Sequence, residues 1–157
     1  MRLVQAGLLD YNERVVSYWP EYGCFGKERT LVKQLLSHQA GIPTLVATLE
    51  PGEIWSWESV TAALAVSEPK WEVGARHGYH ALTWGYIVGC LLERASGVSL
   101  QVLLQREVCD PLRVNFSFGL DKTRAIDAAT LVTGLSPEAP IDKKALANAR
   151  RLDESQL

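Results

Sequence analysis

The sequence predicts a mostly α-helical chain with almost no β-strand, and three observations lead to that prediction. Residues that favour helix N-caps precede apolar segments at Thr30, Ser56 and Ser99. The run 82–92 is apolar on every face that a helix would present. A single short stretch, 114–118, alternates in the way of a strand. With 157 residues, 47% of them hydrophobic, the chain is long enough for one compact domain with its own core.

The first part of the chain predicts two helices joined by an irregular connection. Residues 1–9 are typical of the end of a helix, because their leucines and valine recur at helical spacing. The segment 17–29 contains one proline and two glycines and predicts no regular element. Thr30 then predicts the N-cap of a short helix over 31–38, which stops at Gly41.

The middle of the chain predicts two more helices separated by a loop. Ser56 predicts the N-cap of a helix over 57–67, which Pro69 ends because proline cannot continue the helical hydrogen bonds. The segment 68–78 is a loop by composition. The apolar run then predicts a helix over 79–96 that ends at Gly97, since glycine is favoured directly after a helix.

The apolar run 82–92 has a consequence for packing. A helix without a polar face is normally surrounded by protein, and the other predicted elements offer little to surround this one. We therefore expect side chains such as Ile87 and Leu91 to lack partners within this chain. We also expect the apolar face left open to favour self-association.

The last part of the chain predicts a helix, a strand and a tail. Ser99 predicts the N-cap of a helix over 100–110, with Pro111 beyond its end. The alternating stretch 114–118 predicts the one short strand.

We expect one domain over 1–136 and a polar tail over 137–157 that is a loose helix or disordered.

The composition of the chain argues against several classes of protein. The net charge of -2, without a basic cluster, argues against a nucleic-acid partner. No signal peptide or membrane span is visible, so we expect a cytoplasmic protein. The three cysteines form no C-x-x-C pair, which favours buried reduced thiols.

Several residue patterns suggest chemistry, and each also has a simpler interpretation. Tyr79, just before the apolar run, is either a catalytic group or a core residue whose hydroxyl is bonded. His77 and His80 suggest a metal pair, but no third ligand has suitable spacing, so structural or site-lining histidines are the simpler interpretation. Ser67 and Lys70 spell S-x-x-K, but the proline between them disfavours the helical turn that would join them.

Two further patterns have structural interpretations. Ser37 and His38 suggest a nucleophile and its base, yet adjacent residues on a helix do not face each other. The tryptophans at 55, 57, 71 and 84 are most simply packing groups, although Trp84 with Tyr86 could line a pocket.

Three longer segments carry a resemblance to a known family. They are LVQAGLLDYNERVVSYWPEY, LVKQLLSHQAGIP and PKWEVGARHGYHALTWGYIVGCLLERASGVSLQVLLQREVCDPL, and the match runs from Leu3 to Gly119. In this order they resemble the class C β-lactamase-like serine hydrolases, which include esterases and D-alanyl-D-alanine carboxypeptidase-like proteins. The resemblance implies an ester, amide or lactam substrate and neither a metal nor another cofactor.

The resemblance also implies three catalytic motifs. They are an S-x-x-K nucleophile and its lysine, a Y-x-N tyrosine that shares the work of general base, and a K-T-G or H-x-G motif that shapes the oxyanion hole. Tyr79 matches the tyrosine, within Y-H-A, where Ala81 replaces the usual asparagine. His80 is the next candidate for the proton transfer. The S-x-x-K of the family register and the third motif do not occur in this sequence.

These observations lead to the expectation of a fragment. It would comprise the helical subdomain of a β-lactamase-like serine hydrolase, with the companion sheet largely absent, and would be inactive by itself. The intact parent would transfer an acyl group to a serine and then to water. The alternative is a non-catalytic protein-interaction module derived from the same fold.

Overall fold

The computed structural model describes residues 1–44, 49, 52–53 and 56–119 of the chain. The chain divides into two compact units, Met1–Phe116 and Ser117–Leu157. In the described part of the second unit, the Ser117 hydroxyl donates a 2.9 Å hydrogen bond to the Gly119 carbonyl oxygen. The predicted boundary at residue 136 and the predicted tail lie outside the described residues.

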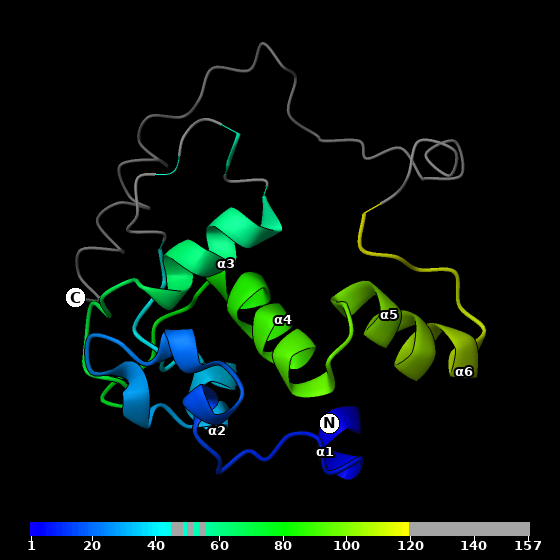
Figure 1. The fold of residues 1–157 in the computed structure, drawn as a ribbon, viewed down its shortest axis with the longest axis horizontal. Helices are drawn as coiled ribbons and strands as arrows, with labels where there is room; N and C mark the ends of the chain where they lie inside the picture. The colour runs from blue at the N-terminus through cyan, green and yellow to red at the C-terminus, as the bar shows by residue number, and fades with distance from the viewer. Residues whose placement is uncertain (45–48, 50–51, 54–55, 120–157) are drawn as a thin grey trace. The chain divides into compact units, whose positions relative to one another are not determined.

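The described part of the chain is helical and contains no strand, so the prediction of mostly α structure is confirmed for it. Its one extended pairing is an isolated antiparallel bridge between Arg14 and Leu31. The elements in chain order are α1 (Arg2–Gln5), 3-10 turns at Val15–Ser17, Pro20–Tyr22 and Lys27–Arg29, α2 (Val32–Leu36), α3 (Trp57–Ala65), α4 (Thr83–Ser96), α5 (Leu100–Leu104), a π-helical turn at Gln105–Cys109 and α6 (Asp110–Leu112) (Figure 1).

The start of α2 differs from the prediction. Thr30 is not the N-cap, because the Val15 N–H donates to its carbonyl oxygen at 2.9 Å and holds it in the extended bridge region. The N-cap is Leu31, whose N–H donates to the Gln34 side-chain oxygen at 2.9 Å. The helix also stops before Gly41, at Leu36. Tertiary pairing has therefore overridden the local capping preference of threonine.

Helix α3 follows its prediction closely. The Ser56 hydroxyl accepts a hydrogen bond from the Ser59 N–H at 3.2 Å, as an N-cap serine should. The helix ends at Ala65, and the segment 68–78 contains no regular element, as expected. Helix α3 packs against α4 (Figure 1), where the Trp57 indole N–H donates to the Glu93 carboxylate at 2.9 Å.

The middle of helix α4 is enclosed within this chain, contrary to the packing expectation. All five residues from 87 to 91 are buried, and Ile87 and Leu91 are only 1% and 0% exposed. At Gly89 an added Cβ would lie 2.5 Å from the Trp57 ring. Helix α4 packs against α2, α3 and α5, and its buried residues share one core cluster with Val15, Trp19 and Tyr22 of the segment 15–22. The helix ends at Gly97, which has a φ of 73° and fulfils its predicted role.

The helix after Ser99 continues further than predicted. The Ser99 hydroxyl accepts from the Val102 N–H at 3.4 Å, which confirms the N-cap. Pro111 does not lie beyond the helix but inside α6. Proline has no N–H to donate to the carbonyl four residues earlier, and its ring crowds that carbonyl. The regular α-helical hydrogen bonds therefore do not continue up to Pro111. The turn at Gln105–Cys109 is instead widened to π geometry.

The predicted strand over 114–118 is wrong. The Val114 N–H donates to the Cys109 carbonyl oxygen at 3.1 Å, and the Cys109 thiol donates to the Phe116 carbonyl oxygen at 3.4 Å. These contacts hold residues 114–116 to the preceding turn, and no partner strand exists among the described residues. Alternating apolar residues without a neighbouring strand cannot form a sheet.

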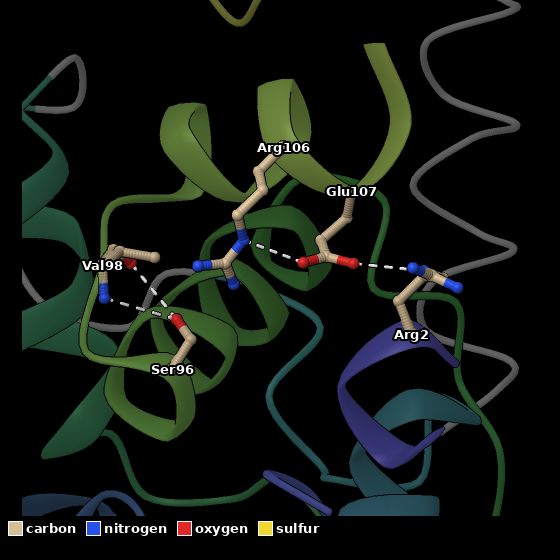
Figure 2. Close-up of polar contacts among 5 residues, drawn as sticks. All are labelled: Arg2, Ser96, Val98, Arg106 and Glu107. Atoms are coloured by element: carbon tan, nitrogen blue, oxygen red, sulfur yellow. Dashed lines mark hydrogen bonds and ion pairs between the residues drawn. The ribbon is translucent and has the colours of Figure 1, made fainter. Parts of the chain in front are cut away.

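An acidic side chain links the first helix to the π-helical turn. Figure 2 shows Glu107 between two arginines. Its carboxylate oxygens lie 3.1 Å from Arg2 Nε and 2.8 Å from Arg106 Nε. The arginine hydrogen bonds hold the pKa of Glu107 below its usual range. Nearby, the Ser96 hydroxyl contacts the Val98 backbone, which closes the connection after α4. Such exposed pairs fix register more than they add stability.

By length and composition, no single described helix could cross a lipid bilayer. One pair, Thr83–Ser96 with Leu100–Leu112, satisfies the same criteria jointly and is bent by 80°.

Candidate functional site

Tyr79 lies on the loop that precedes α4, and its side chain faces solvent. The residue is 75% exposed, so the alternative that it is a core residue is wrong. The helix begins at Thr83 and not at Tyr79 as expected. The catalytic role assigned to Tyr79 remains a prediction, and the contacts around it determine what this residue can do.

His80, beside Tyr79, connects two loops from inside the protein. It is 2% exposed, and its Nε2 accepts a hydrogen bond from the Ile42 N–H at 2.9 Å. Its Nδ1 lies 2.5 Å from the Gly78 carbonyl oxygen and donates to it. Burial lowers the pKa of His80, which agrees with a neutral ring. Because both ring nitrogens are occupied, His80 cannot serve as the alternative proton carrier.

Thr83 completes a clamp on the same backbone unit. Its hydroxyl donates a 2.6 Å hydrogen bond to the carbonyl oxygen of Ile42, whose N–H is already bound by His80. Both side chains are buried. The loop that contains Ile42 is therefore fixed to the start of α4, and the loop of Tyr79 is fixed with it.

His38 supports Tyr79 from the other loop. It adopts a left-handed φ of 61°, and its carbonyl oxygen accepts from the Gly78 N–H at 3.1 Å. Its Nδ1 accepts from the His80 N–H at 3.2 Å. The His38 ring meets the Tyr79 ring in an edge-to-face arrangement at 5.1 Å and lies 5.6 Å from the Trp84 ring. The strained conformation is thus held by contacts to the tyrosine loop.

Close packing between the loops requires two glycines. An added Cβ at Gly78 would lie 2.3 Å from the Trp71 ring. An added Cβ at Gly41 would lie 2.7 Å from the Trp71 carbonyl oxygen, and Gly41 has a φ of 77°. The Trp71 ring also meets the His80 ring edge to face at 5.9 Å. Trp71 is therefore a packing group, as predicted, and the two loops form one rigid support.

The remaining tryptophans differ in exposure and in their contacts. Trp57 is a packing group, since its ring contacts α4 and lies 5.3 Å from the Tyr86 ring. Trp84 is 36% exposed and donates from Nε1 to the Leu36 carbonyl oxygen at 3.2 Å. Trp55 lies outside the described residues.

Ser67 is committed to structural contacts. It is 5% exposed, and its hydroxyl donates a 2.8 Å hydrogen bond to the Ala63 carbonyl oxygen. Its own carbonyl oxygen accepts from the Lys27 ammonium. Lys70 is attached to a different loop, through a 2.7 Å hydrogen bond from its N–H to the Gly41 carbonyl oxygen. The S-x-x-K at Ser67 thus has the structural role preferred from the sequence.

The other two candidate pairs also have structural partners. His77 Nε2 lies 3.1 Å from Gln39 Nε2, and no group of three or more metal-ligating side chains occurs among the described residues. The Ser37 hydroxyl donates to the Lys33 carbonyl oxygen at 2.8 Å, so its proton is directed to the helix and not to His38.

Sequence reasoning missed the clamp that His80 and Thr83 form on Ile42, and it missed the contacts of His38 with the tyrosine loop. His38 was weighed only as a base, whereas His80 was expected to be structural or site-lining, without any indication of its partners. The available signal was the pair of glycines, Gly41 and Gly78, in the two segments that the histidines join. Glycines in both loops indicate a close approach of two backbones.

Comparison with known proteins identifies similar chains. Residues 1–151 match the family model named Beta-lactamase. The chain is 32% identical over 111 residues to the esterase/beta-lactamase LipL of Mycobacterium tuberculosis, which covers 71% of this chain and 25% of that protein.

Two solved structures have similar folds. A penicillin-binding protein homologue from Caulobacter crescentus has a TM-score of 0.78 and 32% identity, over 86% of this chain and 36% of that chain. EstA from Arthrobacter nitroguajacolicus Rue61a has a TM-score of 0.77 and 37% identity, over 88% of this chain and 37% of that chain. The chain therefore spans well under half the length of each of these proteins.

Proposed function

Because the chain belongs to the beta-lactamase family, we propose that it forms the tyrosine-bearing part of a serine hydrolase acyl-transfer site. The observation that supports this most is the exposed Tyr79 side chain, which lies on a loop that is clamped to the loop containing Ile42. A general acid–base group needs both access to the reacting atoms and a fixed position. The described helices are, in this proposal, the helical subdomain of the complete hydrolase.

In the proposed reaction, a serine hydroxyl attacks the carbonyl carbon of an ester, amide or lactam. Tyr79 takes part in removing the proton from that hydroxyl and then supplies a proton to the leaving group. The acyl group passes to the serine and is released by water. The edge of the His38 ring fixes the Tyr79 ring, and the clamp on Ile42 fixes the loop behind it.

The nucleophile is not supplied by residues 1–157 in this proposal. The only S-x-x-K in the sequence is the one at Ser67, and neither K-T-G nor H-x-G occurs. Since the Ser67 hydroxyl donates to a helix carbonyl inside the protein, a substrate cannot reach it. We therefore propose that residues 1–157 alone form no acyl-enzyme.

A labelling experiment tests this proposal directly. Purified residues 1–157 should form no adduct with a serine-directed fluorophosphonate and should not hydrolyse a nitrophenyl ester above background. The same residues joined to the parts of EstA that this chain does not cover should do both. A stoichiometric adduct on the 157-residue chain, abolished by Ser67→Ala, would show that the chain carries its own nucleophile.

An interaction role is the second candidate, and exposed apolar side chains after α4 favour it. Five apolar residues near the end of the first compact unit are 37–67% exposed: Val102, Val108, Leu112, Val114 and Phe116. All five lie between residues 102 and 116, and exposed apolar surface often marks a contact with other proteins. In the second proposal this surface mediates self-association.

Sedimentation provides the measurement for self-association. The chain should sediment as a concentration-dependent oligomer, and Leu112→Glu with Phe116→Glu should convert it to a monomer. Val66→Glu is the matched control, because Val66 is 58% exposed but follows α3. A wild-type chain that remains monomeric at all concentrations would contradict this role.

A further inference from the structure

A tight turn brings a cysteine and a lysine together outside the site described above. The Lys27 N–H donates to the Cys24 carbonyl oxygen at 3.1 Å, which closes a four-residue turn. The two central residues, Phe25 and Gly26, have positive φ values of 53° and 81°. The turn places Lys27 Nζ 3.5 Å from Cys24 Sγ, and the thiol also donates to the Ala65 carbonyl oxygen at 3.2 Å.

The lysine of this turn is buried without an acidic partner. Lys27 is 0% exposed, and the ion pairs among the described residues do not include it. Its ammonium contacts the Ser67 carbonyl oxygen, the Cys24 sulfur and the faces of the Tyr22 and Phe25 rings. Burial lowers the pKa of Lys27, because removal from water disfavours the charged form. More of this amine is therefore uncharged and nucleophilic than for an exposed lysine.

A buried tyrosine stands beside the same pair. Tyr22 is 0% exposed, and Lys27 Nζ lies 5.3 Å from the centre of its ring. Burial raises the pKa of Tyr22, so its hydroxyl stays protonated and supplies no counter-charge to the lysine. Tyr22 thus adds no negative charge beside the lysine and the thiol.

The cysteine is the most accessible of the three in the chain. Cys24 is partly exposed, whereas Cys90 and Cys109 are buried. A small oxidant from solvent should therefore react with Cys24 first, since oxidation of cysteine follows exposure and thiolate character.

We propose that Cys24 and Lys27 form an oxidation-dependent covalent cross-link, with hydrogen peroxide as the oxidant. The Cys24 thiolate takes one peroxide oxygen and becomes a sulfenic acid, while the other oxygen leaves as hydroxide and is protonated to water. The Lys27 amine then attacks the sulfenic sulfur. An S–N bond forms, the S–O bond breaks, and the leaving hydroxide carries away one amine proton as water. The product is a sulfenamide, in which sulfur has been oxidised and peroxide reduced.

The cross-link would change the chemistry of the turn. It removes the positive charge of Lys27 and retains one N–H that can still donate to the Ser67 carbonyl oxygen. Thiols reduce sulfenamides, so the modification is reversible. The turn would then be tied by a covalent bond where it packs against the end of α3.

Peptide mapping of the wild-type 157-residue chain tests the proposal. After treatment with hydrogen peroxide and trypsin digestion without reductant, peptide 15–27 should be replaced by peptide 15–29, because trypsin does not cleave after a derivatised lysine. The new peptide should be lighter by about 2 Da than its unmodified sequence, the loss of two hydrogens. Dithiothreitol should restore cleavage after Lys27. Oxidised Cys24 with normal cleavage after Lys27, or Cys24 that does not react, would overturn the proposal.

Variants separate the role of the amine from that of the thiol. Lys27→Met should abolish the cross-link and increase trapping of the Cys24 sulfenic acid by dimedone severalfold. Lys33→Met is the matched control, because Lys33 is exposed on α2, and it should leave the cross-link intact. If Lys27→Met shows no increase in dimedone trapping, the amine does not consume the sulfenic acid and the proposal is wrong. The wild-type peptide map decides the question even where a variant does not fold.

Discussion

Tyr79→Phe is expected to lower kcat by about 10²–10⁴-fold, the usual contribution of a general acid–base group. The measurement requires a chimeric protein in which this chain is joined to the parts of EstA that it does not cover. Phenylalanine keeps the ring that packs against His38 at 5.1 Å and removes only the hydroxyl. Because the Tyr79 side chain is 75% exposed, loss of its hydroxyl should not affect folding.

The matched control is Tyr86→Phe in the same chimera. Tyr86 belongs to α4 and its ring lies 5.3 Å from the Trp57 ring, so the same chemical change there should leave kcat nearly unaltered. If Tyr79→Phe retained near-full turnover, another group would have to carry the proton. His80 would not be that group, because its ring nitrogens contact Ile42 and Gly78.

Local capping chemistry made much of the helical structure predictable. Ser56 and Ser99 cap helices with their own hydroxyls, and Gly97 ends α4 with a positive φ. These interactions span a few residues, so the sequence alone contains them. Thr30 failed as a cap because its carbonyl pairs with Val15, a residue from a different segment.

Predictions that depended on distant contacts were less successful. Residues 114–118 alternate like a strand, but a strand also needs a neighbour, and the described residues offer none. The site shows the same limit. Tyr79 was identified by resemblance, whereas the clamp from His80 to Ile42 joins residues 38 positions apart. No periodicity or spacing within either loop indicates that pairing.

The enclosure of α4 was also missed, for a related reason. The segment 17–29 was interpreted as an irregular connection, and connections are usually found at the surface. Here three short 3-10 turns place Trp19, Tyr22 and Lys27 entirely inside the protein. A segment without regular structure can thus supply side chains to the same core that encloses the middle of α4, which packs directly against α2, α3 and α5.

Leu91→Ala should therefore destabilise the 157-residue chain by about 2–5 kcal/mol, the typical cost of removing a fully buried leucine side chain. Leu91 is 0% exposed, and the cavity left behind would be lined by a core that cannot fully relax.

Leu82→Ala is the matched control, because Leu82 directly precedes the same helix but is 79% exposed, and its loss should change stability by less than about 0.5 kcal/mol. Urea denaturation followed by far-UV circular dichroism gives both values. Since small domains are stable by only about 5–15 kcal/mol, the Leu91 variant should have a clearly lower midpoint at an unchanged slope. Equal and small effects of the two substitutions would show that α4 is not enclosed by this chain, and that its apolar faces depend on a partner.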